Sequence, residues 1–231
     1  SNWHFHELLT EAGLPPGVIN FLPGDSVEVS RALLADRHLA GIHFTGSTEV
    51  FRSLWRTCAG NLDRYLAYPR IVGETGGKDF ILAHPSADVD ALAVGMVRGA
   101  YEYQGQKCSA ASRAYIPASL WPAVRDRVVG MIADIRMGDV ADFRNFMGAV
   151  IDRRAFDRIR DHLARARNDA GARVVAGGGT DDSVGYFVEP TLIQADDPSY
   201  RLMCEEIFGP VLTVHVYPDA RWTETLSLVD G

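Results

Sequence analysis

The stretch GIHFTGSTEVF, residues 41–51, decides the fold class of this chain. Its first five residues, Gly41 to Thr45, have the character of a short strand, and Gly46-Ser47-Thr48 then predicts a turn into a helix. On its N-terminal side, residues 25–35 have apolar residues at helical spacing, and Val18 to Leu22 predicts another short buried strand. Strands that alternate with helices are typical of a mostly parallel α/β sheet, in which ligands bind at the carboxyl ends of the strands.

The same alternation continues toward the C-terminus, without an internal repeat or a low-complexity tract. Short apolar runs predict further strands, and longer segments with helical apolar spacing predict further helices. The expected strands lie at 71–73, 80–82, 115–116, 174–175, 187–188, 192–193 and 211–216, and the expected helices lie at 4–12, 87–101, 119–135 and 152–170.

Composition predicts a folded, soluble protein. Its 231 residues are 47% hydrophobic and have a formal net charge of −7, and this length fits one large domain or parts of two. Lysine- or arginine-rich runs are absent from the sequence, so we expect neither a nucleic-acid partner nor a membrane partner. The three cysteines are widely spaced and odd in number, which favours a reducing compartment.

Two residues are candidates for chemistry. Cys108 follows Gly105-Gln106-Lys107 in a polar, turn-prone stretch, whereas structural cysteines usually lie among apolar neighbours. Glu74 precedes two glycines and a lysine. Taken alone, each has a more common role, as a buried structural cysteine and as a solvated surface acid. Of the seven histidines, His4 and His6 lack further convergent ligands, and the other five have no cysteine or carboxylate at ligand spacing, so we expect no metal site.

Three motifs in the same order resemble the aldehyde dehydrogenase superfamily: ETGGKD at 74–79, QGQKCSAASR at 104–113 and EEIFGP at 205–210. The resemblance extends over essentially the whole chain. It implies an α/β fold with parts of two doubly wound, mostly parallel-sheet, Rossmann-like domains. Residues 1–73 would be the C-terminal part of an NAD-binding domain, and residues 74–231 an incomplete catalytic domain. Members of this superfamily are about twice as long, so the chain resembles an internal portion of one.

The resemblance also implies the roles of the two candidate residues. Cys108 matches the nucleophile, whose thiolate attacks an aldehyde carbonyl to give a thiohemiacetal, after which hydride leaves for NAD. Glu74 matches the general base that activates water to hydrolyse the resulting thioester. The Cys108 backbone N–H would supply one donor to the oxyanion, and the family's second donor, an asparagine, would precede residue 1.

The resemblance also implies which residues bind the cofactor and the substrate. Gly46 and Ser47 match the loop before the helix that faces the NAD pyrophosphate. Glu206 matches the acid that binds the nicotinamide ribose, and Phe208 the aromatic residue that borders the nicotinamide ring. Ser109 and Lys107 flank the nucleophile and suit a substrate that has its own carboxylate. Phe51 departs from the commoner family pattern, which has a second glycine at this place.

Four stretches resemble the Δ1-pyrroline-5-carboxylate dehydrogenase branch of the superfamily: 61–64, 73–80, 103–110 and 182–190. Phe51 also fits this branch. The expected function is therefore NAD-dependent oxidation of L-glutamate γ-semialdehyde to L-glutamate in proline catabolism. The alternatives are another semialdehyde dehydrogenase and a noncatalytic remnant of the fold. We further expect a homo-oligomeric full-length protein of the bacterial cytoplasm or the mitochondrial matrix, and little turnover by these 231 residues alone.

Overall fold

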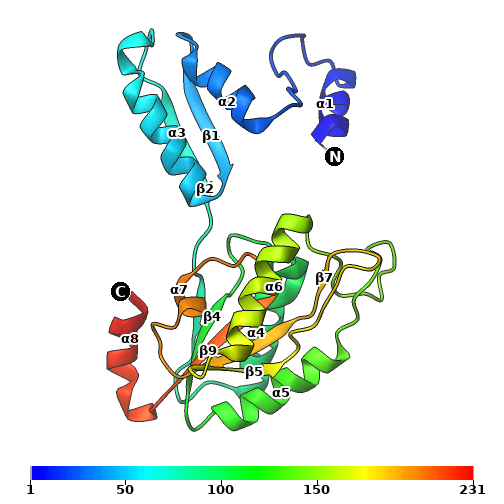
Figure 1. Cartoon of the computed structure of the whole chain (residues 1–231), viewed down its shortest axis with the longest axis vertical. Helices are drawn as coiled ribbons and strands as arrows, with labels where there is room; N and C mark the ends of the chain where they lie inside the picture. The colour runs from blue at the N-terminus through cyan, green and yellow to red at the C-terminus, as the bar shows by residue number, and fades with distance from the viewer. Residues whose placement is uncertain (1, 231) are drawn as a thin grey trace. The chain divides into compact units, whose positions relative to one another are not determined.

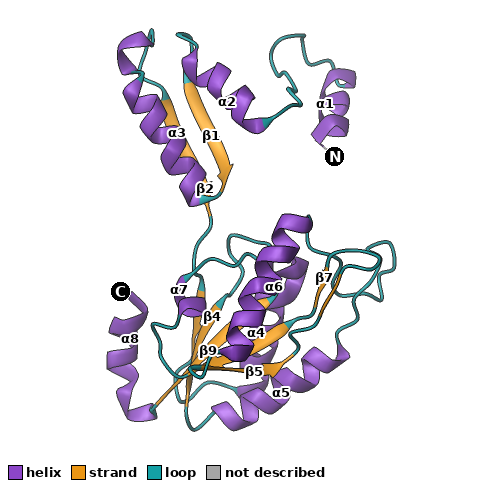
Figure 2. Cartoon of the chain, viewed as in Figure 1, coloured by secondary structure: helices purple, strands orange, loops and turns teal. Residues whose placement is uncertain are grey.

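The computed structural model describes residues 2–230 and, within helix α8, the side chains up to Val229. The chain folds into two compact units, Ser1–Thr75 and Gly76–Gly231, which we name the N-terminal unit and the C-terminal unit. Figures 1 and 2 show that both contain helices packed beside strands.

The N-terminal unit is built around two parallel strands. Strand β1 (Gly41–Gly46) pairs with β2 (Arg70–Thr75) in a register that places Phe44 opposite Gly73. The helical elements of this unit are α1 (Asn2–Glu11), α2 (Ser26–Ala35), α3 (Thr48–Gly60) and the short 3-10 helix η1 (Leu62–Arg64).

Side chains fix the starts of two of these helices. The Asp25 carboxylate accepts the N–H groups of Val27 and Glu28 at 3.0 Å, which begins α2. The Ser47 hydroxyl accepts the Val50 N–H at 3.3 Å, which begins α3 directly after β1.

The prediction of a strand at Val18 to Leu22 is wrong. This segment has a bend at Val18 and Ile19 followed by irregular backbone, and its apolar side chains are solvent-exposed, from 36% for Phe21 to 62% for Val18. Pro23 follows directly and disfavours a ladder at this end of the segment, because proline has no N–H to donate. A short apolar run alone therefore did not specify a strand here.

The C-terminal unit has a five-stranded sheet in the order β3-β4-β9-β8-β5. All neighbours in it are parallel except β5 and β8, which are antiparallel, so the predicted mostly parallel α/β class is confirmed. The strands are β3 (Phe80–Leu82), β4 (Arg113–Pro117), β5 (Ala172–Ala176), β8 (Thr191–Ala195) and β9 (Val211–Tyr217).

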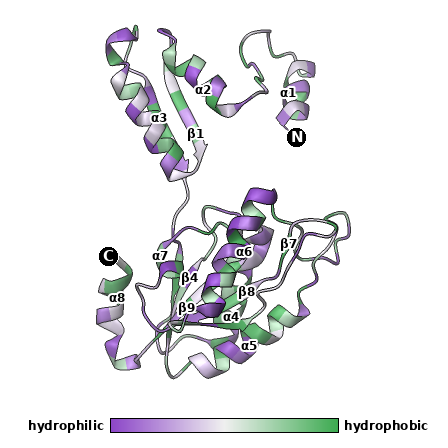
Figure 3. Cartoon of the chain, viewed as in Figure 1, coloured by the Kyte–Doolittle hydropathy of each residue, from purple (hydrophilic) through white to green (hydrophobic). Residues whose placement is uncertain are grey.

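Helices cover both faces of this sheet. Successive residues of β8 point to opposite faces of the sheet and pack into different apolar clusters. Leu192 packs in the cluster formed with α4 (Val89–Tyr101) and α5 (Trp121–Asp134). Ile193 packs in the cluster formed with α6 (Arg153–Asn168). Figure 3 shows the apolar residues of this unit gathered around α4 and the neighbouring strands. This is the layered arrangement expected of an α/β unit.

Smaller elements complete the C-terminal unit. They are η2 (Glu102–Gly105), the hairpin of β6 (Thr180–Asp181) and β7 (Phe187–Val188), α7 (Arg201–Cys204), η3 (Asp219–Arg221) and α8 (Trp222–Asp230). Within residues 2–230, no helix has the length and apolar character needed to cross a bilayer.

Candidate active site

The loop that holds Cys108 has an unusual backbone. It follows α4 through η2, where three consecutive residues have left-handed φ angles: Tyr103 at 55°, Gln104 at 58° and Gly105 at 63°. Residues with a Cβ adopt this region only at a cost, so the surrounding structure must stabilise it. Cys108 then lies exposed at the surface in a turn closed by the Ala110 N–H and the Lys107 carbonyl, 3.1 Å apart.

Two glutamine side chains tie this loop to the segment at 149–151. Gln104 Nε2 donates to the Ala149 carbonyl, and Gln106 Oε1 accepts the Ile151 N–H, each at 3.1 Å. Both connect residues 45 positions apart in the chain. The loop is therefore fixed on both sides of Gly105, and these two glutamines are site residues that the motif analysis did not single out.

Gly105 also joins the nucleophile loop to the EEIFGP motif. A Cβ built at Gly105 would lie 2.7 Å from the Ala100 carbonyl oxygen and closer still to that of Gly209. Only a residue without a side chain allows the two backbones to approach this closely. Phe208, directly before Gly209, itself has a left-handed φ of 54° and is half-buried.

The Cys108 backbone N–H is available to an external acceptor. Among residues 2–230, no carbonyl or side-chain oxygen accepts it. Ser109 beside it is also exposed. A free N–H next to an exposed thiol is the arrangement that can stabilise an oxyanion formed on the sulfur's reaction partner.

Lys107 has an electrostatic partner within the chain. Its Nζ lies 2.7 Å from the Glu102 carboxylate, which also pairs with Arg98 at 2.8 Å. The hydrogen bond from Lys107 lowers the pKa of Glu102, so this carboxylate stays ionised. The charge of Lys107 is therefore already compensated, which weakens it as an anchor for a substrate carboxylate.

Glu206 lies against the Gly76-Gly77-Lys78 segment. A Cβ on Gly76 would come within 2.6 Å of Glu206 Oε2, so the glycine leaves the space that the carboxylate occupies. Glu206 is accessible to solvent, but partial burial raises the pKa of its carboxyl group, and the nearby Lys78 charge and Gly77 backbone oppose this effect. The structure thus brings together two motifs that are about 130 residues apart.

Lys78 is the charged residue that the sequence analysis missed. Burial lowers its pKa to about 8, although the negative charge of Glu206 favours the protonated form. Its Nζ donates to the Leu202 carbonyl at 3.0 Å, and its own carbonyl accepts Arg113 Nε at 2.8 Å. The only sequence signal for this site was a single lysine between two short expected strands. Its acidic neighbour, Glu206, is about 130 residues away in the sequence, so the pair could not be recognised from a local motif.

The two predicted positions of the cofactor loop and the predicted general base lie in the N-terminal unit. Gly46 and Ser47 form the turn from β1 into α3, and the Phe44 ring occupies the place of a Gly46 side chain. Glu74 is exposed near the end of β2, opposite Thr45. Glu74 and Cys108 therefore belong to different units.

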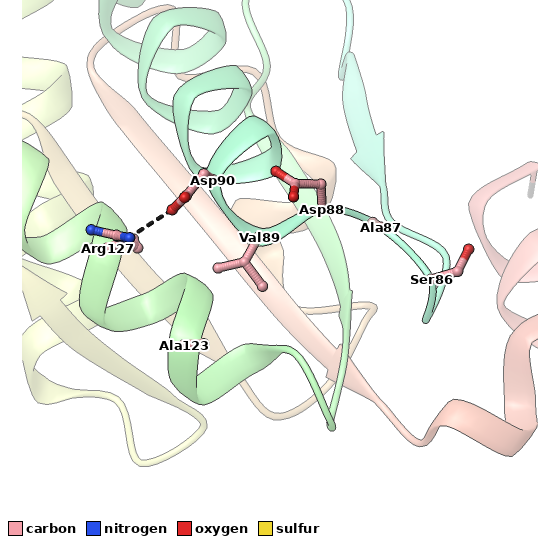
Figure 4. Close-up of a pocket in the computed structure, with 7 residues that line it drawn as sticks. All are labelled: Ser86, Ala87, Asp88, Val89, Asp90, Ala123 and Arg127. Atoms are coloured by element: carbon pink, nitrogen blue, oxygen red, sulfur yellow. Dashed lines mark ion pairs between the residues drawn. The ribbon is translucent and has the colours of Figure 1, made fainter.

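One surface hollow of the C-terminal unit is remote from Cys108 along α4. It measures about 600 Å³ and lies at the opposite, N-terminal end of this helix, where Asp90 pairs with Arg127 at 2.7 Å (Figure 4). A helix of 13 residues is about 20 Å long, so this hollow is separate from the nucleophile loop. The described part of the chain also has no cluster of three or more potential metal ligands.

Comparison with known proteins shows the protein family of this chain. The sequence profile described as "Aldehyde dehydrogenase family" matches residues 1–225, and the chain belongs to this family. Over its whole length it is 52% identical to the mitochondrial Delta-1-pyrroline-5-carboxylate dehydrogenase of Dictyostelium discoideum and 48% identical to that of Homo sapiens. The chain spans 42% and 41% of the length of these two relatives.

Solved structures agree with the sequence relatives. The structure of Delta-pyrroline-5-carboxylate dehydrogenase from Mycobacterium tuberculosis bound with NAD has a TM-score of 0.93 and 51% identity, over 99% of this chain and 42% of that one. The 1-pyrroline-5-carboxylate dehydrogenase from Thermus with bound NAD has a TM-score of 0.89 and 36% identity, over 97% of this chain and 43% of that one.

Proposed function

We propose that this chain provides the nucleophile and the general base of an NAD-dependent dehydrogenase that oxidises L-glutamate γ-semialdehyde to L-glutamate. The observation that supports this best is the 52% identity to a Delta-1-pyrroline-5-carboxylate dehydrogenase, over a region that includes the exposed Cys108. The complete protein's activity would need the segments that its longer relatives possess.

The Cys108 thiolate attacks the aldehyde carbon and forms a C–S bond, and the carbonyl oxygen becomes an oxyanion that the free Cys108 N–H stabilises. Loss of hydride from that carbon leaves a thioester. Glu74 then takes a proton from water, the resulting hydroxide attacks the thioester, and the product leaves as the C–S bond breaks. The strained loop keeps the thiol in a fixed position throughout.

The residues present fit part of a dinucleotide. The capped N-terminus of α3 after Ser47 presents backbone N–H groups and a positive helix end, which suits a phosphate. Glu206 has an accessible carboxylate that can accept hydrogen bonds from ribose hydroxyls, with Phe208 two residues away. When bound, NAD accepts the hydride that the substrate carbon loses.

In this proposal the exposed hydroxyl of Ser109 binds the substrate carboxylate. Lys107 contributes less, because its ammonium group is already paired with Glu102. Oxidation of glutamate γ-semialdehyde, with succinate semialdehyde as a competitor, tests this assignment in the full-length protein. We expect kcat/KM to be higher for glutamate γ-semialdehyde. Preference for the shorter dicarboxylate substrate would indicate another semialdehyde dehydrogenase, and no NAD reduction with any aldehyde would indicate a noncatalytic remnant.

A further inference from the structure

Phe51 and Gly73 have complementary shapes. A Cβ built at Gly73 would lie within 2.6 Å of three atoms at the edge of the Phe51 ring, where ordinary contacts begin at about 3.4 Å. The Phe51 ring, which projects from α3, therefore rests directly on the backbone of β2. It fills the space that a side chain at position 73 would need. Both residues belong to the N-terminal unit.

The Phe51 ring has aromatic neighbours on two further sides. It stacks on Phe44 with ring centroids 6.1 Å apart and an angle of 15°, and it meets Trp55 edge-on at 5.6 Å and 70°. These contacts hold the ring on two sides, while Phe51 is only half-buried and Trp55 is 54% exposed, so bulk added at Gly73 displaces both the ring and the strand. The strand takes up the part of the overlap that the ring does not.

Glu74 follows Gly73 directly. In the β1–β2 register, Phe44 is opposite Gly73 and Thr45 is opposite Glu74. Successive residues of a strand point to opposite faces, so position 73 faces α3 and Glu74 points away from it. A change in the spacing between α3 and β2 therefore moves the Glu74 carboxylate along the direction in which it points.

We propose that Phe51 is a positioning residue for Glu74, because its ring sets the distance of β2 from α3 through the bare backbone of Gly73. This inference rests on the proposed role of Glu74 as the general base. It assigns a role to the phenylalanine that stands where the commoner pattern has a glycine. Phe51 itself touches no reacting atom in this account.

The size of the effect follows from the overlap. A methyl group at Gly73 must gain about 1 Å from its contacts with the Phe51 ring, and the half-buried ring and the strand share this shift. Misplacing a catalytic group by about 1 Å costs about 100-fold in rate, so about half of that shift costs about tenfold. The loss should affect thioester hydrolysis, which needs the base, and should leave thioester formation nearly unchanged.

The test compares variants of the full-length protein that contains this chain. Rapid-quench measurements give the rate of thioester formation and the rate of thioester hydrolysis separately. We expect Gly73→Ala to slow hydrolysis about tenfold and to change formation less than about threefold. Gly60→Ala is the matched control, because a Cβ there meets nothing within 4 Å, and it should change neither rate.

A volume exchange separates positioning from simple damage. Phe51→Gly combined with Gly73→Leu moves the bulk from the helix to the strand, so hydrolysis should return to within about threefold of the wild type. Equal slowing of both steps by Gly73→Ala, or no recovery in the exchange variant, would overturn the inference. Glu74→Gln distinguishes the two proposals: if it leaves hydrolysis unchanged, the proposed base is wrong, and if only Gly73→Ala is silent, the positioning role alone is wrong.

Discussion

Replacing Gly105 by alanine should destabilise the C-terminal unit by about 3 kcal/mol. The left-handed φ of 63° costs a residue with a Cβ about 1 to 2 kcal/mol, and forcing a methyl group into a packed site costs a further 1 to 3 kcal/mol or so. The second cost applies because the new Cβ would meet the Gly209 and Ala100 carbonyl oxygens, which are fixed backbone atoms.

Urea unfolding followed by near-ultraviolet circular dichroism measures this change, since Tyr101, Tyr115 and Tyr217 are buried in the same unit. With a slope of about 2 kcal/mol per M, the midpoint should fall by about 1.5 M. Gly130→Ala is the matched control in the middle of α5, where a Cβ meets nothing within 4 Å, and it should stabilise by about 0.5 to 1 kcal/mol. A Gly105→Ala protein within about 0.5 kcal/mol of the wild type would refute the close approach of the two backbones.

Three further predictions concern the site residues. Gly76→Ala should raise the KM for NAD at least about tenfold and change kcat little, because the methyl group displaces the Glu206 carboxylate; steady-state kinetics at varied NAD checks this. Burial lowers the pKa of Lys78 to about 8, so the unfolded chain binds the proton more tightly than the folded chain does. The free energy of unfolding should therefore rise by about 1.5 kcal/mol between pH 8 and 9.5, and Lys78→Met should lack this rise in urea titrations at the two pH values. Ser109→Ala should raise the KM for the semialdehyde more than Lys107→Ala does, since the Lys107 ammonium is already paired.

Much of the fold could be predicted because strands and helices left local signals. The strand at Gly41 to Thr45 and the helix with Phe156, Ile159 and Leu163 on one face have the expected apolar periods. The strand predicted at Val18 to Leu22 failed because a short apolar run does not show whether a partner strand exists to pair with it.

The site was predictable where a motif is local and hidden where it depends on distant contacts. The GQKCS stretch indicated Cys108 directly, but the left-handed backbone at Tyr103 and Gln104 depends on a contact that the motif does not contain, the hydrogen bond from Gln104 to Ala149, 45 positions away. The complementarity of Phe51 and Gly73 also needs the strand register, which the sequence does not state.

The direct test of the central claim is to trap the covalent intermediate. Full-length Glu74→Gln protein, mixed with NAD and glutamate γ-semialdehyde and then quenched in acid, should retain the acyl group as a thioester that peptide mass spectrometry places on Cys108. Cys204 is the internal control, because it is equally a free and exposed cysteine. An adduct on Cys108 alone is the predicted result, and an adduct on Cys204, or NADH formation with no adduct on any cysteine in the Glu74→Gln protein, would contradict the account.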